Sequence, residues 1–219
     1  MTGARVRRLV AGGALTAACA GLLGGVAAAD APEVGVATLV DASGEPIAGG
    51  GSRTPFGIEL SGKAECQGDS ADADYRVNSY VVPASLAPAD IPFDGLGPTP
   101  EGHGTHDAFR QPLYDIDTTF FVSIQTANAE REGDPGTILP LPQFDFDVFG
   151  PGDFPAGRYH VGIACTLFNE VTRAWDALIE VVDDPTDEPA GIAWSVVDFE
   201  PAADSSLPVV PAALGALAA

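Results

Sequence analysis

Two histidines and an aspartate occur together in one short stretch of the chain. His103-Gly-Thr-His106-Asp107 places two imidazoles and a carboxylate within five residues. A metal site would need neutral imidazoles that converge with at least one further ligand, and the neighbouring sequence guarantees none. Histidine pairs in loops are usually exposed, so we expect no metal here. The alternative, a ligand pocket or enzyme site built on the loop 83–111, requires these side chains to be buried in a pocket.

Aspartates alternate with apolar residues in two other places. Asp115-Ile-Asp117-Thr-Thr119 matches the DxDxT pattern of haloacid-dehalogenase-like phosphotransferases. That chemistry needs a parallel α/β fold and a lysine later in the chain, whereas Lys63 lies upstream and no helices alternate with strands. The pattern is therefore not taken as catalytic.

The same aspartates could act as calcium ligands. Asp115, Asp117, Asp145 and Asp147 offer hard oxygen donors, but none belongs to a DxDxDG loop. Because they alternate along expected strands, we predict weak and diffuse calcium binding. The sequence also contains no GxSxG and no HExxH motif. We therefore expect a protein without enzymatic activity or cofactor.

The first 29 residues have the pattern of a secretory signal peptide. Arg5, Arg7 and Arg8 precede an apolar segment over 9–26, and alanines at 27–29 offer a cleavage site before Asp30. Cys19 leaves a lipoprotein signal as the alternative, although Thr16 stands where such a signal prefers leucine. We expect a mature, extracytoplasmic chain that starts at Asp30.

Removal of that segment leaves two cysteines, Cys66 and Cys165. In an oxidising compartment an even pair of cysteines predicts a disulfide. The bond would close a loop of about 100 residues, which is worth about 4 to 5 kcal/mol in the chain-entropy model.

The stretch 157–166 predicts the strand around which the fold is organised. Tyr159, Val161, Ile163 and Cys165 fall on one face of it. The other face carries His160 and two small residues, which indicates a strand covered on one side only.

Further alternating segments predict strands that are separated by turn residues. No segment before residue 201 has sustained helical periodicity, so the fold class is all-β. The expected strands cover 34–40, 55–60, 75–82, 120–126, 144–148, 159–166 and 175–181, with 192–199 open to one more. Glycines 49–51 are expected in a loop, and the proline-rich stretch 83–111 is expected to be a long non-helical excursion.

The expected organisation has five parts. A signal peptide over 1–29 precedes an N-terminal strand and linker over 30–54 and a β-sandwich over 55–183. An acidic, proline-rich linker over 184–206 leads to a flexible apolar tail over 207–219. That tail is short for a membrane span, which leaves a truncated membrane anchor open. It also departs from the LPxTG pattern of cell-wall sorting.

The charge balance restricts the partners. The chain has 31 acidic and 10 basic side chains and a net charge of −21. Such a surface repels phosphates and anionic lipids, so nucleic acid is not expected as a partner. An extracellular protein or a component of the cell envelope is expected instead, with C-terminal membrane association left open.

Three stretches together resemble a known class of proteins. Cys66-Gln-Gly-Asp-Ser, the strand at 75–83 and the segment 157–166 resemble secreted, uncharacterised proteins of high-GC Gram-positive bacteria with immunoglobulin-like or fibronectin-type surface modules. The resemblance covers about residues 55 to 199 and implies an immunoglobulin-like antiparallel β-sandwich with one disulfide between its sheets. In that fold 157–166 corresponds to strand F. The expected function is display at the cell envelope for protein interaction, adhesion or spacing.

Overall fold

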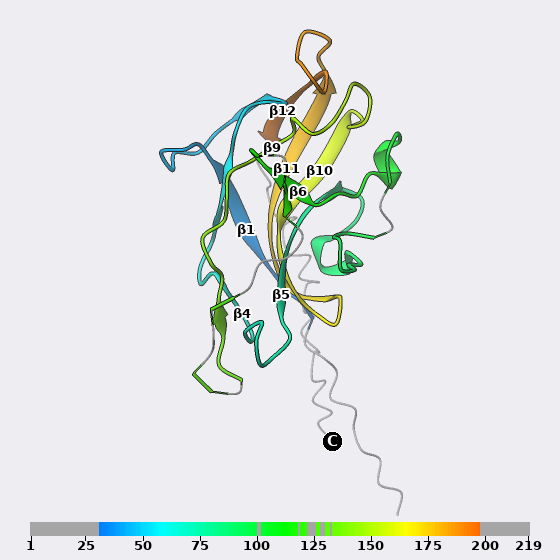
Figure 1. Ribbon diagram of the computed structural model, residues 1–219. Coiled ribbons are helices and arrows are strands. Elements are labelled where there is room, and N and C mark those ends of the chain that lie inside the picture. Colours follow the sequence, from blue (N-terminus) through cyan, green and yellow to red (C-terminus); the bar gives the residue numbers. More distant parts are fainter. Residues whose placement is uncertain are drawn as a thin grey trace, which may run out of the picture. The chain divides into compact units, whose positions relative to one another are not determined.

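The structure is a computed structural model that describes residues 31–99, 102–117, 119–121, 126–127, 130–131 and 133–197. Within these residues the protein is almost entirely β, as expected, with two short 3₁₀ helices (Figure 1). The strands are β1 (Glu33–Val40), β2 (Gly49–Gly51), β3 (Gly57–Leu60), β4 (Glu65–Cys66), β5 (Arg76–Pro83), β6 (Leu113–Asp115), β7 (Phe120–Phe121), β8 (Gly136–Thr137), β9 (Phe144–Asp145), β10 (Gly157–Leu167), β11 (Glu170–Asp183) and β12 (Ile192–Val197). The 3₁₀ helices are η1 (Pro88–Asp90) and η2 (His106–Ala108).

A long hairpin of β10 and β11 is the centre of the main sheet. Its register pairs Tyr159 with Ile179 and Ile163 with Trp175. The turn consists of Phe168 and Asn169, with φ values of 49° and 71°. Positive φ at both central residues is typical of the tight turns whose twist matches that of paired strands.

The main sheet forks at one edge of β11 (Figure 1). β1 runs parallel to the first part of β11, with Val36 opposite Asp176 as the last pair. β12 runs antiparallel to the remaining part, starting with Val197 opposite Leu178. Beyond Val36 the strand β1 pairs with β3 instead. The other edge of the hairpin, along β10, pairs with β5.

One face of the main sheet carries the large core. Tyr159, Ile163, Cys165 and Trp175 are buried there, which confirms the alternation expected for β10 and β11. The small sheets β7–β6–β9 and β4–β8 supply residues to the same core. Its aromatic members make many tilted and edge-to-face ring contacts, a geometry that aromatic pairs prefer. They include Phe56, Phe109, Phe144, Phe146, Phe149, Phe154 and Trp194.

The predicted disulfide is confirmed. Cys66 and Cys165 are joined with a Cα–Cα distance of 5.5 Å, and neither residue is exposed to solvent. The bond ties β4 to β10 within the large core.

The opposite face of the main sheet is also covered, so the expectation of a strand with one covered side is wrong. Ala164 is fully buried and His160 is only 8% exposed. The reason is the proline-rich excursion after β5, which folds back over this face. Its residues Ile91 and Phe93 pack with Tyr80 in a second apolar cluster. As expected, the described residues of the excursion, 83–99 and 102–111, contain no α-helix.

Three segments outside the expected sandwich range 55–183 belong to the main sheet, namely β1, β2 and β12. The glycines expected in a loop form β2, which pairs with β12. A Cβ on Gly49 would lie 2.1 Å from the carbonyl oxygen of Trp194, so only glycine permits this approach. β12 is the further strand left open over 192–199, and its Trp194 is buried in the core.

Several expectations lie outside the described residues. These are the signal peptide over 1–29 with Cys19, most of the expected strand beyond Phe121, and the tail over 207–219. Across the part of the chain that the structure describes, no helix has the length and apolarity needed to cross a membrane.

Candidate functional site

The histidines of the excursion have structural partners. Nε2 of His106 lies 2.9 Å from the backbone oxygen of Arg158, and its Nδ1 lies 3.0 Å from Oδ1 of Asp107. The His106 ring also packs edge-on against Tyr159, at 4.8 Å between centroids. His103 instead lies beside Gln111, with 3.3 Å between their Nε2 atoms. These contacts attach η2 to the start of β10.

The arrangement required by the alternative site on this loop is not found. The side chain of Asp107 is 91% exposed, and His103 is also exposed. Among the described residues no three His, Cys, Asp or Glu side chains gather closely enough to hold a metal ion.

The alternating aspartates close turns. Oδ1 of Asp115 accepts hydrogen bonds from the backbone N–H groups of Asp117 and Thr119, at 3.0 and 2.9 Å. Asp145 accepts one from Asp147 at 3.1 Å, and burial raises the pKa of the Asp145 carboxyl. Asp147 in turn pairs with Arg53 at 3.2 Å. These carboxylates therefore stabilise local loop structure.

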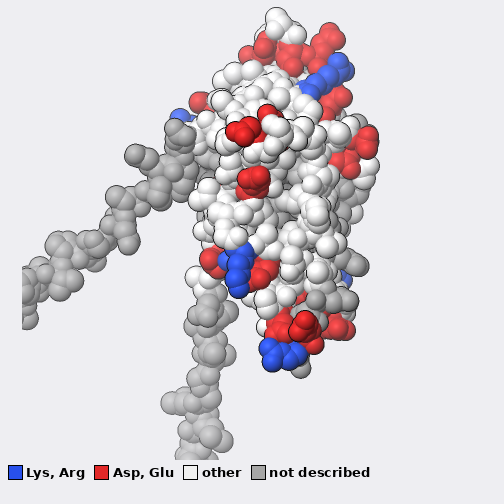
Figure 2. All heavy atoms as spheres, turned by 90° about the vertical axis from the view of Figure 1, so that its left-hand side faces the viewer, with Lys and Arg blue, Asp and Glu red and all other residues white. Residues whose placement is uncertain are grey.

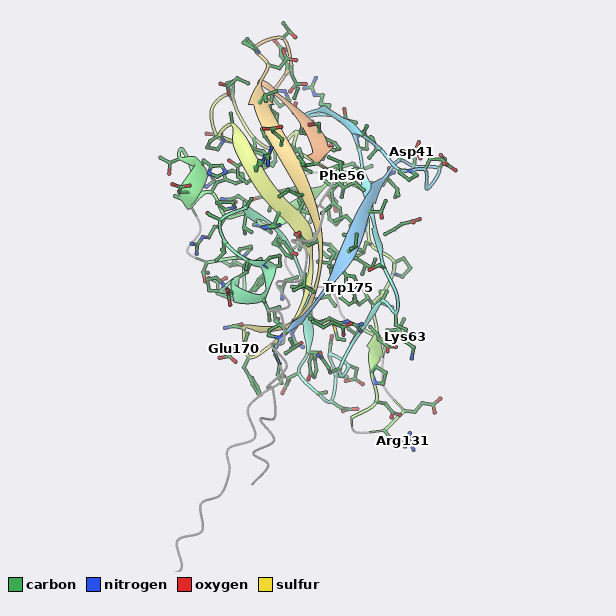
Figure 3. All side chains as sticks on the ribbon, turned by 180° about the vertical axis from the view of Figure 1, so that it is seen from behind. Asp41, Phe56, Lys63, Arg131, Glu170 and Trp175 are labelled. Atoms are coloured by element: carbon green, nitrogen blue, oxygen red, sulfur yellow. A yellow bond between two sulfur atoms is a disulfide. The ribbon has the colours of Figure 1, made fainter. Side chains whose placement is uncertain are left out.

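A groove of about 770 Å³ lies at the fork of the main sheet. Figure 3 shows β1 running away from β11 beyond the level of Trp175 and toward Asp41, which opens the sheet at this point. The groove is lined mainly by apolar residues of β1, the segment before β2, and the facing parts of β11 and β12. They are Val34, Gly35, Val36, Ala37, Thr38, Leu39, Pro46, Ile47, Ala48, Ala177, Leu178, Val196 and Val197, with Pro88, His160 and Asp176.

A buried polar cluster, formed by Tyr80, His160 and Asp176, lies beside this groove. Nδ1 of His160 is 2.7 Å from Oδ2 of Asp176, and their side chains are 10% and 11% exposed. The Tyr80 hydroxyl donates to the backbone oxygen of Trp175 at 3.1 Å and contacts Oδ1 of Asp176 at 3.4 Å. Three neighbouring strands, β5, β10 and β11, thus contribute one side chain each.

A glycine makes the cluster possible. A Cβ on Gly162 would lie 2.0 Å from the oxygen of Trp175 and 2.5 Å from the Tyr80 hydroxyl. The absence of a side chain on β10 therefore lets the Tyr80 ring cross the strand and reach β11.

Burial controls the protonation of this cluster. Burial raises the pKa of Asp176, and the hydrogen bond and charge of His160 partly oppose this shift. Burial also raises the pKa of Tyr80 well above its ordinary value, and the neighbouring Asp176 adds to the effect. Tyr80 is therefore a neutral donor at physiological pH. An ionised Asp176 accepts from His160, whose Nδ1 then carries a proton.

The remaining nitrogen of His160 has no such partner. Within the described residues Nε2 makes no hydrogen bond, although the ring lines the groove. In a neutral imidazole that is protonated at Nδ1, Nε2 is a hydrogen-bond acceptor. The groove thus combines mainly apolar walls with an available acceptor, the combination typical of small-molecule sites.

From sequence, His160 is expected on the face of its strand opposite Tyr159, with no role, and neither Tyr80 nor Asp176 is expected to be a site residue. The sequence contains a pattern from which the pairing of His160 with Asp176 could have been predicted. A tight turn at 168–169 sets the register of the hairpin, and strand alternation then puts His160 and Asp176 on the same face, diagonal to each other.

The chain carries a net charge of −21, yet the surface on the side of β1 is mostly uncharged. Figure 2 shows the side of the molecule on which β1 lies in Figure 1, and its acidic and basic side chains are scattered over a mostly uncharged surface.

Comparisons with protein-family models, curated proteins and solved structures give no match to this chain.

Proposed function

We propose that this protein is an exported, immunoglobulin-like module of the cell envelope that acts through binding and contacts rather than by catalysis. The observation that carries the proposal is the disulfide between Cys66 and Cys165, both fully buried. Disulfides of this kind form and persist in oxidising compartments, outside the cytoplasm. The basic and apolar pattern of residues 1–29 agrees with export.

The strand neighbourhood supports the immunoglobulin-like assignment. In such domains strand F lies between strands C and G and carries one cysteine of the intersheet disulfide. β10 lies between β5 and β11 and carries Cys165. The Tyr159 hydroxyl donates to the backbone oxygen of Pro155 at 2.6 Å, a contact like that of the tyrosine corner before strand F. Tyr159 stands six residues before Cys165, whereas the corner tyrosine stands two residues before the cysteine.

A role through contacts is favoured over catalysis on the loop 83–111. In that loop His106 is bonded to the backbone and Asp107 points into solvent, so the two do not form a sheltered acid–base pair. The scattered surface charge and the rigid, disulfide-linked sheets suit a module that presents surface to an extracellular protein or envelope component.

Export is tested by expressing the full chain in a high-GC Gram-positive host. After fractionation, free thiols are labelled under denaturing conditions with a maleimide that adds mass. We expect mature protein outside the cytoplasm, with no label on Cys66 or Cys165. Full-length protein in the cytoplasm with both thiols labelled would contradict the proposal.

The contact role needs a second measurement. The exported protein is displaced with chaotrope from isolated envelopes, and purified protein is then added back. Saturable retention that survives Asp107→Asn and His106→Gln would support contacts outside the excursion. Loss of retention with either substitution would favour the alternative site on the loop 83–111.

A further inference from the structure

The groove at the fork of the main sheet has the size and lining of a site for a small molecule. Its volume of about 770 Å³ falls in the range of ligand pockets, roughly 300–1,000 Å³. Val34 and Val36 of β1 remain 46% and 61% exposed on its wall. This inference does not depend on export or on the immunoglobulin-like assignment.

His160 distinguishes this groove from an ordinary surface hollow. The residue is 8% exposed, and Nε2 has no hydrogen-bond partner among the described residues. The fully buried unpaired side-chain atoms of the described residues are Ser52 Oγ, Arg110 Nε and Gln111 Oε1. Nε2 of His160 is not one of them, so it is open to the groove and a bound molecule can reach it.

The polar cluster determines which ligand group can supply that partner. Asp176 accepts from His160 at 2.7 Å and lies within 3.4 Å of the Tyr80 hydroxyl, so its oxygens are already engaged. Nδ1 of His160 donates to Asp176, which leaves Nε2 as an acceptor in the neutral ring. The ligand group must therefore be a donor.

The charge of the ligand group is restricted by Asp176 and by the apolar walls of the groove. A ligand carboxylate would approach Asp176 in a protein with a net charge of −21 and would be repelled. A cation would lose its hydration against walls of valine, leucine and alanine. A hydroxyl is a neutral donor and meets both conditions.

We propose that the groove binds a small, neutral, apolar molecule that carries a hydroxyl group, and that this hydroxyl donates a hydrogen bond to Nε2 of His160.

Three probes of nearly equal size test the proposal on the purified, disulfide-linked chain. 2-Naphthol has the hydroxyl, naphthalene lacks it, and 2-naphthoate carries a carboxylate. We expect 2-naphthol to bind roughly three- to tenfold more tightly than naphthalene, the effect of one net hydrogen bond. 2-Naphthoate should bind the least tightly of the three. Dissociation constants come from ligand-observed NMR titrations at neutral pH.

Two variants locate the site. His160→Gln should reduce the preference for 2-naphthol over naphthalene to less than about twofold while naphthalene still binds. Because Asp176 would lose its partner, this variant could fail to fold, and Val36→Asp provides an independent test. It adds a charge at an exposed wall position and should weaken 2-naphthol binding at least about fivefold.

A matched control separates the groove from a general effect of charge. Val182 is 51% exposed on β11 and does not line the groove, so Val182→Asp should leave binding unchanged. The proposal is overturned if no probe binds, if 2-naphthol and naphthalene bind equally, or if the two aspartate variants weaken binding to the same extent.

Discussion

The two faces of the β5–β10–β11 sheet are built by different means. The face toward the small sheets holds large aromatic rings and a disulfide, and its residues follow strict alternation. The opposite face combines a smaller apolar cluster around Ile91 and Phe93 with the buried polar cluster of Tyr80, His160 and Asp176. The first face provides stability by extensive apolar burial, whereas the second buries less apolar surface and in addition holds polar groups that require hydrogen bonds.

The largest expected loss of stability comes from a substitution on the face of the sheet that holds the large aromatic rings. Phe154 is fully buried and stacks on Phe109 at 4.4 Å between ring centroids. Phe154→Ala should lower the free energy of unfolding by about 3 to 5 kcal/mol, because it removes apolar contacts and leaves a cavity. Denaturant titration measures the change. The comparison of the faces would fail if Phe93→Ala, on the opposite face, cost more.

The disulfide comes next. Replacing Cys66 and Cys165 together by alanine should cost about 2 to 5 kcal/mol, because the unfolded chain is released from a long closed loop. The cysteines are 99 residues apart in sequence. Thermal and denaturant unfolding of the double variant measure the cost, with reduced wild-type protein as the control. Equal stability of the oxidised and reduced wild type would contradict this expectation.

We expect the stability contributed by Asp176, in the buried cluster with Tyr80 and His160, to depend on pH. Burial raises the pKa of Asp176 above its ordinary value of 3.8, so the folded state holds this proton more tightly than the unfolded state. The stability contributed by Asp176 is therefore greatest below pH 3.8 and falls as pH rises through the folded-state pKa. Each tenfold difference in proton affinity corresponds to about 1.4 kcal/mol.

Asp176→Asn removes that dependence. The difference in unfolding free energy between wild type and variant should decline with rising pH in this window and stay level above it. Because both proteins share all other carboxylates, the subtraction cancels their contributions and leaves those of Asp176 and its hydrogen-bonded partner His160. A difference that instead grows with pH would mean that the folded state favours the ionised carboxylate.

The smallest effect concerns the corner before β10. Tyr159→Phe removes the hydroxyl that donates to Pro155 and should cost about 0.5 to 1.5 kcal/mol. Tyr75→Phe is the matched control, because its hydroxyl has no hydrogen bond among the described residues. Equal changes in the two variants, measured by denaturant titration, would remove the support for a tyrosine corner.

The sequence predicted the elements whose pattern is local. The alternation of Tyr159, Ile163 and Trp175 gave strands and their buried face, and the count of cysteines gave the disulfide. β2 was missed because a run of glycines has no alternation to detect. The covering of the opposite face was missed because it depends on the excursion folding back over the sheet, a contact that local pattern does not encode.

The site was missed for a related reason. The stretch with His103, His106 and Asp107 is conspicuous because its residues are adjacent in sequence, yet it serves to attach a loop. Tyr80, His160 and Asp176 lie on three different strands, and only the pairing of those strands brings them together.

The most direct test of the account is the ¹⁵N NMR spectrum of the His160 ring at neutral pH, assigned by its absence in His160→Gln. We predict a protonated Nδ1 and an unprotonated Nε2, whose resonance moves on addition of 2-naphthol but not of naphthalene. A proton on Nε2, or an Nε2 resonance that 2-naphthol leaves unchanged, would contradict the assignment of this face as a binding site.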